Sequence, residues 1–317
     1  MELWTGFKRA DIQNVLEINL RATQGTAITR AIGTPKKFLG FDNLMFVPPQ
    51  LTALPNPGET KVDMNVVLGE KAARPLNLPI PLLISGMAYG ITLSEPAKIA
   101  LARGAKFSGT AICSGEGPYL EEERLEADKY ILQISHWPWG LRKDKEIASA
   151  DMVEVHLGQG AQMGSYYLTP EEIKGKARKL MGLPPFKGIT RLPAPIGIKS
   201  PADWPKFFKT LRQRVNGIPI GIKMMATDKI EEDLAVAIDC GVDVIAIDGA
   251  QGGAFVSNPT MQDDFGIPSL HALVRAVRYL ESHGVDLSPN DLVALDDFTA
   301  QLTGAKKSIL SYCCRLF

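Results

Sequence analysis

The sequence has few of the features that mark disulfide-rich, metal-binding or nucleic-acid-binding proteins. Its 317 residues include only four cysteines, and no CxxC or paired Cys/His spacing occurs, which argues against disulfide frameworks and zinc or other metal sites. Apart from the neighbours Cys313 and Cys314, the cysteines lie far apart in the chain. Basic and acidic residues both total 35, so the formal net charge is zero. This balance predicts no nucleic acid partner and no anionic membrane partner.

Long hydrophobic runs are also missing. The longest apolar stretch, residues 76–88, is interrupted by Asn77, two prolines and Ser85, and it is too short to span a bilayer. The charged residues Lys8 and Arg9 lie where a signal peptide would need an apolar core. The sequence therefore predicts a soluble, cytoplasmic protein.

Short apolar runs alternate with helical patterns from residue 80 onward, as in βαβ units of a parallel sheet. In the clearest unit, a strand at 218–222 precedes a helix with an apolar stripe that includes Ile230 and Leu234. Gly241 is expected to end that helix in the left-handed conformation, and residues 242–247 form the next strand. A helix is also expected from about Asp11 to Arg21.

These units predict a TIM (β/α)8-type barrel that is incomplete at its eighth βα unit. We expect residues 1–75 to form an N-terminal extension packing on the barrel, and residues 76–317 to form the barrel, with an irregular insert at about 157–217 closed by a helix at 204–214. A helix capped by Ser94 is expected to end at Gly104. After Leu295 only the segment 308–312 is a candidate for the eighth strand, so the chain reads as shortened or altered there. The predicted strands span residues 80–85, 107–113, 130–134, 152–156, 218–225, 242–248 and 292–295.

Polar residues cluster where these strands end, which is where barrels of this class build their sites. The first strand runs into Ser85-Gly86-Met87, and the second into the sequence Gly-Glu116-Gly. Glycines allow the backbone to approach a flat ligand closely, although tight turns at the surface explain both loops equally well. Gln133 offers amide donors and an acceptor at the end of the third strand, where it is either a ligand contact or a buried structural amide.

Three later strand ends carry charged or amide groups. His156 and Glu154 are two residues apart, so both point to the same face of the fourth strand. At this position a structural role for His156 is as well supported as a catalytic role. Lys223 ends the fifth strand, and a lysine inside a barrel is costly unless it meets an anion such as a reduced flavin. A Schiff-base role for Lys223 in an aldolase-like barrel is a further alternative. The sixth strand leads into the glycine-rich segment 248–253.

Together these motifs resemble the FMN-binding synthase domain of the glutamate synthase family, in its stand-alone form. The likeness extends from about Phe41 to Leu295 and includes five segments. These are ISGMAYG at 84–90, AKIALARGA at 97–105, SGEG at 114–117, Glu154 with GQGA at 158–161, and DGAQGG at 248–253.

The resemblance implies an FMN oxidoreductase that reduces an imine of 2-oxoglutarate and ammonia to glutamate. A small-molecule substrate is implied, with a glutaminase or electron-donor subunit as a possible partner. In the family pattern Lys223, Glu116 and His156 fall on catalytic positions, and Gln159 and Gln251 on substrate-binding positions. The residues placed at the cofactor are Ser85, Gly86, Met87, Gln133, Lys223, Gly252 and Gly253.

Several positions depart from the family pattern. The arginine expected shortly after Gln133 is absent, with Arg142 as a distant substitute, and His156 replaces a lysine. No cysteine pattern for an iron–sulfur cluster follows the barrel. Asp296-Asp297 replace a Gly-Gly pair at the expected phosphate site, and two carboxylates there oppose a phosphate. We therefore expect weak FMN binding by the isolated chain, and a non-catalytic barrel acting as a subunit or binding module is the alternative.

Overall fold

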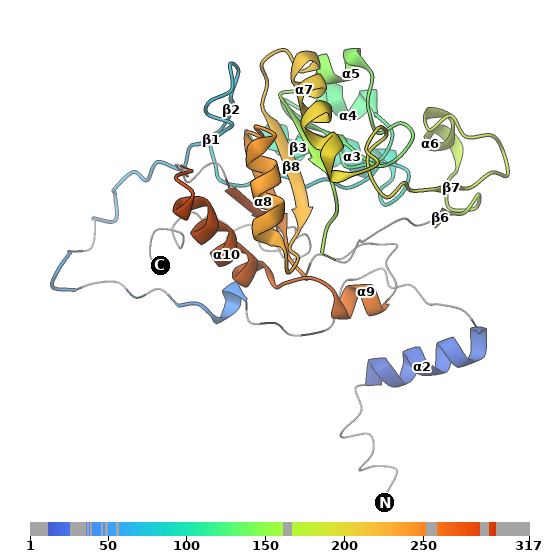
Figure 1. The fold of residues 1–317 in the computed structure, drawn as a ribbon, viewed down its shortest axis with the longest axis horizontal. Helices are drawn as coiled ribbons and strands as arrows, with labels where there is room; N and C mark the ends of the chain where they lie inside the picture. Colours follow the sequence, from blue (N-terminus) through green and yellow to red (C-terminus); the bar gives the residue numbers. More distant parts are fainter. Residues whose placement is uncertain are drawn as a thin grey trace, which may run out of the picture.

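The structure is a computed structural model that describes residues 12–25, 36, 38, 40–45, 47, 50–54, 57–160, 167–251, 259–285 and 292–295 (Figure 1). Its main element is a parallel six-stranded sheet in the order β10-β9-β8-β5-β4-β3. Ile84 extends this sheet beyond β3 through a parallel bridge to Ile112. The strands are β3 (Ala111–Cys113), β4 (Lys129–Ile134), β5 (Met152–His156), β8 (Ile220–Met225), β9 (Val244–Asp248) and β10 (Leu292–Leu295).

Helices from successive βα units pack on one face of the sheet. Buried residues of α3, α5, α7, α8 and α10 all join one apolar cluster with the strand residues that point to that face. A doubly wound sheet would carry helices on both faces, whereas a barrel carries them only outside. The predicted TIM-type barrel is therefore confirmed, and its described residues form an incomplete ring. The helices are α3 (Glu95–Phe107), α4 (Glu121–Glu126), α5 (Asp144–Ala148), α7 (Trp204–Arg214), α8 (Ile230–Asp239) and α10 (Ser269–Ser282).

Side chains alternate strictly between the two faces of the strands, as the strand period of two requires. Val153 and Ile222 point outward into the helix cluster, whereas Ile131, Met152 and Val244 point inward. The inner side chains pack against an antiparallel hairpin of β1 (Val66–Leu68) and β2 (Leu76–Leu78). This hairpin closes the end of the lumen opposite to the strand ends that carry the polar residues.

Two predicted boundaries at the start of the barrel are wrong. Helix α3 continues past Gly104 to Phe107, and β3 begins only at Ala111. Gly109, with φ +70°, makes the turn between them, because glycine adopts this conformation without strain. The first predicted strand is reduced to the single bridge at Ile84.

Other boundaries agree with the prediction. Helix α7 spans the predicted residues 204–214, and Gly241 ends α8 with φ +66°. The N-terminal helix is present as α2 (Ile12–Gln24), followed by the 3-10 turn η1 (Phe41–Asn43). The candidate eighth strand at 308–312 and the pair Asp296-Asp297 lie outside the described residues.

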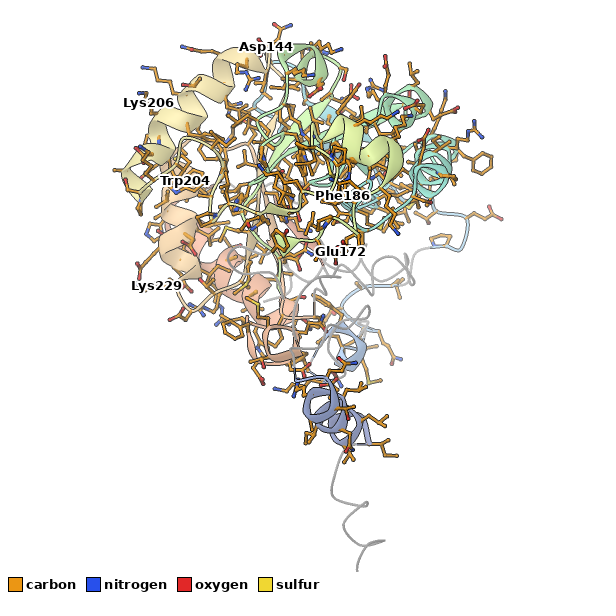
Figure 2. The ribbon with its side chains drawn as sticks, turned by 90° about the vertical axis from the view of Figure 1, so that its right-hand side faces the viewer. Asp144, Glu172, Phe186, Trp204, Lys206 and Lys229 are labelled. Atoms are coloured by element: carbon orange, nitrogen blue, oxygen red, sulfur yellow. The ribbon has the colours of Figure 1, made fainter. Side chains whose placement is uncertain are left out.

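The insert between β5 and α7 covers one side of the strand ends. Its strands β6 (Tyr167–Leu168) and β7 (Ile189–Thr190) pair antiparallel around α6 (Gly175–Leu180). The insert lies toward the viewer in Figure 2, where Glu172 and Phe186 mark it. Two short helices complete the described elements, η2 (Pro201–Asp203) and α9 (Pro259–Asp264).

Insert residues are anchored on the loops that follow the first barrel strands. Leu168 and Ile173 of the insert pack with Tyr89, Leu120 and Trp137 in a separate apolar cluster. This contact brings the insert next to the predicted site. Among the described helices, none is long and apolar enough to cross a membrane.

Candidate functional site

The polar inner side chains form a layer above the apolar floor of the lumen. Gln133, Glu154 and His156 are each at most 7% exposed, and Lys223 and Asp248 are fully buried. The strand register explains the grouping, because Gln133 lies opposite Glu154 on β5, and His156 lies opposite Lys223 on β8. The sequence therefore placed Gln133, His156 and Lys223 correctly at a common lumen, while their roles remain predictions.

Lys223 meets a carboxylate from the next strand. Its Nζ lies 2.9 Å from Oδ2 of Asp248, and both side chains are shielded from solvent. Burial of either charge alone would be costly, and the pair offsets much of that cost. Lys223 therefore meets an anion within the protein itself, as its buried position requires.

Gln133 is held by an acidic neighbour. Its Nε2 donates a hydrogen bond of 2.7 Å to Oε1 of Glu154. The same carboxylate oxygen lies 3.7 Å from the thiol of Cys113 on β3. Burial, followed by the charge of Glu154, raises the pKa of the Cys113 thiol well above its usual value, so the thiol stays protonated. Cys113 therefore serves this layer as a hydrogen-bond donor and not as a thiolate nucleophile.

The loop after the first barrel strand lies directly against Gln133. A Cβ atom on Gly86 would stand 2.8 Å from Nε2 of Gln133, so this position depends on the absence of a side chain. Ser85 is buried and Met87 is half-buried beside it. Of the three predicted ring contacts in this loop, Gly86 thus borders the lumen layer, and Ser85 and Met87 flank it in the chain.

A fully buried ammonium group joins this loop to the next one. Nζ of Lys98 in α3 donates to the carbonyl oxygens of Met87 at 2.8 Å and Ser114 at 3.1 Å. It also pairs with Glu123 at 2.7 Å. Sequence reasoning placed Lys98 in a family motif without giving it a role, and nothing in the helical pattern distinguishes it from a surface lysine.

Glu116, the carboxylate of the Gly-Glu-Gly loop, is paired with an arginine that sequence reasoning missed. Nε of Arg191 lies 3.1 Å from Oε2 of Glu116, and Nη2 of Arg191 lies 3.4 Å from Nδ1 of His156. Arg191 follows β7 in the insert and is 1% exposed. It stands in the segment Thr-Arg-Leu-Pro, which carries no periodicity or glycine pattern that could have identified it.

These contacts define the tautomer of His156. A guanidinium group has only donors, so Nδ1 of His156 accepts the bond from Arg191 and Nε2 carries the proton. The second nearby histidine, His136, has a pKa lowered to about 3, first by burial and then by the charge of Arg191. Nδ1 of His136 donates to the carbonyl oxygen of Leu192 at 3.1 Å. His136 is therefore a neutral neighbour of Arg191, and Nδ1 of His156 also lies 3.9 Å from Oε2 of Glu116.

Arg142, the predicted substitute for the family arginine, serves the backbone. Its Nε donates to the carbonyl oxygen of Gln133 at 2.6 Å, and its Nη2 donates to that of Gly115 at 3.1 Å. The side chain is 6% exposed. Arg142 supports the two loops from behind, and the guanidinium that reaches Glu116 and His156 is that of Arg191.

The remaining predicted residues are placed less centrally. Gln159 is half-buried after β5. Oε1 of Gln251 accepts bonds of 3.0 Å from the backbone N–H and the hydroxyl of Ser269, so it supports the start of α10. Gly252 and Gly253 lie outside the described residues. In the described part of the chain no group of three or more His, Cys, Asp and Glu residues could hold a metal ion.

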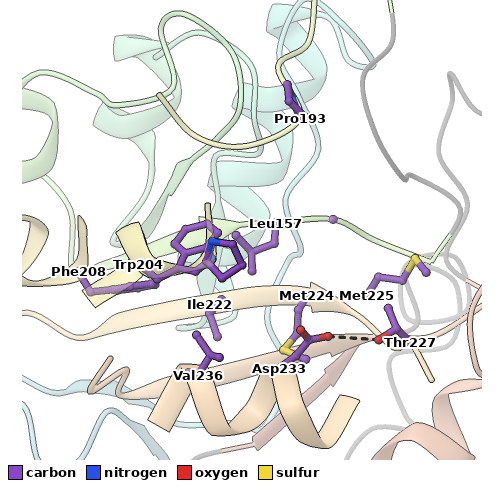
Figure 3. Close-up of a pocket in the computed structure, with 13 residues that line it drawn as sticks. Leu157, Pro193, Trp204, Phe208, Ile222, Met224, Met225, Thr227, Asp233 and Val236 are labelled. Carbon is purple, nitrogen blue, oxygen red and sulfur yellow. Dashed lines mark hydrogen bonds between the residues drawn. The ribbon is translucent and has the colours of Figure 1, made fainter. Parts of the chain in front are cut away.

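A cavity of about 360 Å³ lies on the outer face of β8, away from this layer (Figure 3). Trp204 and Phe208 of α7 form one wall, and Ile222 and Met224 point toward it from the strand. A hydrogen bond of 3.2 Å from Thr227 to Asp233 lies at its edge. Because Lys223 points to the opposite face, this cavity is separate from the candidate site.

Comparison with known proteins places these features in a family. Residues 46–288 match the family described as "Conserved region in glutamate synthase". A "Glutamate synthase large subunit-like protein" of Rhizobium meliloti (strain 1021) is 31% identical over 293 residues, which cover 87% of this chain and 62% of that protein. An "Archaeal-type glutamate synthase [NADPH]" of Thermotoga neapolitana is 28% identical over 232 residues, covering 70% and 44% respectively. The chain thus spans about three fifths of the first relative and less than half of the second.

Among solved structures, an inosine 5' monophosphate dehydrogenase from Legionella pneumophila matches with a TM-score of 0.52 and 16% sequence identity. The match covers 90% of this chain and 67% of that one. At this identity the likeness shows the fold alone, and it agrees with the barrel described above.

Proposed function

The chain belongs to the glutamate synthase family, and we propose from this membership and the lumen layer that it is an FMN-dependent oxidoreductase acting on an imine of a small 2-oxo acid. The observation that carries the proposal is the contact of Gly86 with Gln133, on a lumen shared with Lys223. A glycine, an amide and an ammonium group are the chemistry that a flat ring with carbonyl and N–H edges needs.

The residues present fit the ring portion of FMN. A Cβ atom at position 86 would stand 2.8 Å from Gln133 and 3.0 Å from Gly115, so this glycine lets the loop pack closely on the lumen residues that would contact the ring. Ser85, Gly86 and Met87 would line the ring, and Gln133 and Lys223 would contact its polar edge. When reduced, FMN supplies a hydride to an electron-poor carbon.

The chain's own residues would hold and orient the substrate. Lys223, held by Asp248, places an ammonium group at the lumen as one half of an ion pair. With Arg191 at Nδ1, His156 would contact a substrate nitrogen or oxygen through Nε2. Glu116 holds Arg191 in place beside it. The burial of this layer excludes water from the groups that contact the substrate.

A non-catalytic barrel is the second candidate, and one observation favours it. The polar groups of the lumen already bond one another, as Lys223 does with Asp248 and Gln133 does with Glu154. Such a lumen can be a satisfied core of a subunit or binding module.

Flavin titration separates the two candidates. We expect the purified chain to quench FMN fluorescence saturably, and Lys223→Gln to weaken FMN binding by about tenfold, a loss of about 1.4 kcal/mol. Met224→Leu, one residue away on the outer face of β8, is the matched control and should bind like the unmodified chain. A folded chain that fails to bind FMN at millimolar concentration would support the non-catalytic barrel.

A further inference from the structure

Arg191 is an unusual group in this barrel because a long insert carries its charge into the strand ends. The chain leaves β5, forms the β6–β7 hairpin, and returns so that Arg191 lies against Glu116 and His156. The backbone N–H of Leu192 donates to the carbonyl oxygen of His136, which fixes this return to the loop after β4. The guanidinium is therefore held at a defined place beside the lumen.

The ion pair is asymmetric in its access to solvent. The Arg191 side chain is 1% exposed, whereas the Glu116 side chain is 12% exposed. Among its described neighbours, His136 is neutral and Nδ1 of His156 accepts a bond from Arg191. Glu116 is thus the more accessible partner of a buried cation.

The backbone around Glu116 is locked. A Cβ atom on Gly115 would stand 2.6 Å from the backbone of Met87, and one on Gly117 would stand 2.5 Å from the carbonyl oxygen of Tyr89. Gly115 also has φ +71°. Nε1 of Trp139 also donates to the carbonyl oxygen of Glu116 at 2.9 Å, so an exchange of partners at Arg191 would involve the Glu116 side chain and not its backbone.

We propose that Arg191 is the substrate-binding residue of this site for a carboxylate, and that Glu116 occupies its guanidinium until a ligand carboxylate replaces it. The ligand class is a small 2-oxo acid, and the inference rests on the proposed function for its place beside the flavin. Arg191 binds a planar carboxylate through two parallel N–H donors, a geometry that lysine lacks. His156 lies beside Arg191, and Lys223 lies opposite His156 on the next strand.

Competition between Glu116 and a ligand carboxylate for Arg191 predicts a result that a purely structural ion pair does not. Removing the charge of Glu116 leaves Arg191 without its internal competitor, so ligand affinity should rise. Removing the guanidinium should abolish the affinity. If the pair served folding alone, these two changes would not shift anion affinity in opposite directions.

The test is isothermal titration of the full chain with 2-oxoglutarate, and with its dimethyl ester as the uncharged probe. We expect Glu116→Gln to bind 2-oxoglutarate at least about threefold more tightly, and Arg191→Gln at least about tenfold more weakly, than the unmodified chain. The ester should bind no variant measurably. Glu122→Gln, which removes a surface carboxylate paired with Lys176, controls for net charge and should leave affinity unchanged.

Arg191→Lys keeps a positive charge beside Glu116 and so protects the fold if the glutamine variant unfolds. We expect it to melt near the unmodified chain and still lose most of the affinity. The inference is overturned if Glu116→Gln fails to bind 2-oxoglutarate more tightly, or if either Arg191 variant binds it as the unmodified chain does.

FMN fluorescence titration of the same variants distinguishes the two proposals. We expect Arg191→Gln to bind FMN within about twofold of the unmodified chain, because Arg191 contacts the loop carboxylate and not the ring positions. Opposite changes of anion affinity in a chain that binds no FMN would reject the proposed function and keep the role of Arg191. FMN binding with no gain in Glu116→Gln would reject the role of Arg191 alone.

Discussion

Lys98 and Glu123 form an ion pair in which neither side chain is more than 1% exposed, and the lysine also binds carbonyl oxygens of both loops that border the lumen. Burial raises the pKa of the Glu123 carboxyl, while the charge of Lys98 opposes that rise. The pair therefore connects helices α3 and α4 to the backbone of the candidate site.

Breaking this pair on one side should be far more damaging than removing it whole. We expect Lys98→Met to lower the free energy of unfolding by about 3–5 kcal/mol, because Glu123 remains buried without a cation. The double variant Lys98→Met/Glu123→Leu should recover most of that loss. Urea denaturation of the two variants measures the difference, and a double variant that is less stable than Lys98→Met would contradict the expectation.

Two glycines should respond with opposite sign to alanine. Gly117→Ala places a Cβ atom 2.5 Å from the carbonyl oxygen of Tyr89, and we expect a loss of about 1–3 kcal/mol of stability. Gly104→Ala, inside α3 with no atom within 4 Å of the added Cβ, should gain about 0.5–1 kcal/mol from helix propensity. Thermal unfolding of both variants tests the pair, and equal effects would count against the tight loop packing.

His136 should make stability fall in mild acid. Its pKa is lowered from 6.5 to about 3 in the folded chain, so below pH 6.5 the unfolded chain binds more protons and stability is lost as the pH falls. Between pH 8 and pH 5 this residue should account for a loss of about 2 kcal/mol. His136→Asn, whose amide can still donate to Leu192, should lack this component, and denaturation curves at both pH values measure it. Identical pH profiles for the two proteins would refute the assignment.

Lys223 and Asp248 should be strongly coupled. In a double-mutant cycle with Lys223→Met and Asp248→Asn, we expect a coupling free energy of about 2–3 kcal/mol in stability, because each single change leaves a buried group of the 2.9 Å pair unmatched. Additive losses within about 0.5 kcal/mol would show that the two side chains act independently.

The alternation of the strands made much of this site predictable from sequence. The apolar runs identified β4, β5, β8 and β9, and once those were parallel strands of one barrel, Gln133, His156 and Lys223 had to meet at the same end. The predicted helix at 204–214 also matches α7 to the residue. These features depend on local pattern, which is why a single sequence was sufficient.

Long-range partners could not be predicted in the same way. The sequence places Asp248 at the start of a glycine-rich loop, but its pairing with Lys223 depends on the register between β8 and β9. Arg191 reaches Glu116 across 75 positions of sequence through an insert with no periodic pattern. The predicted start of β3 is too early because Phe107, an apolar residue, is the exposed last residue of α3, and the strand begins only after the turn at Gly109.

The β1–β2 hairpin closes the amino-end side of the lumen in the described part of the barrel. Leu68, Leu76 and Leu78 pack there against the inward residues of the strands, so small molecules cannot reach the polar layer through this floor. A substrate and a product that both pass the carboxyl ends of the strands would do so in turn, and a slowly departing product would delay the next substrate.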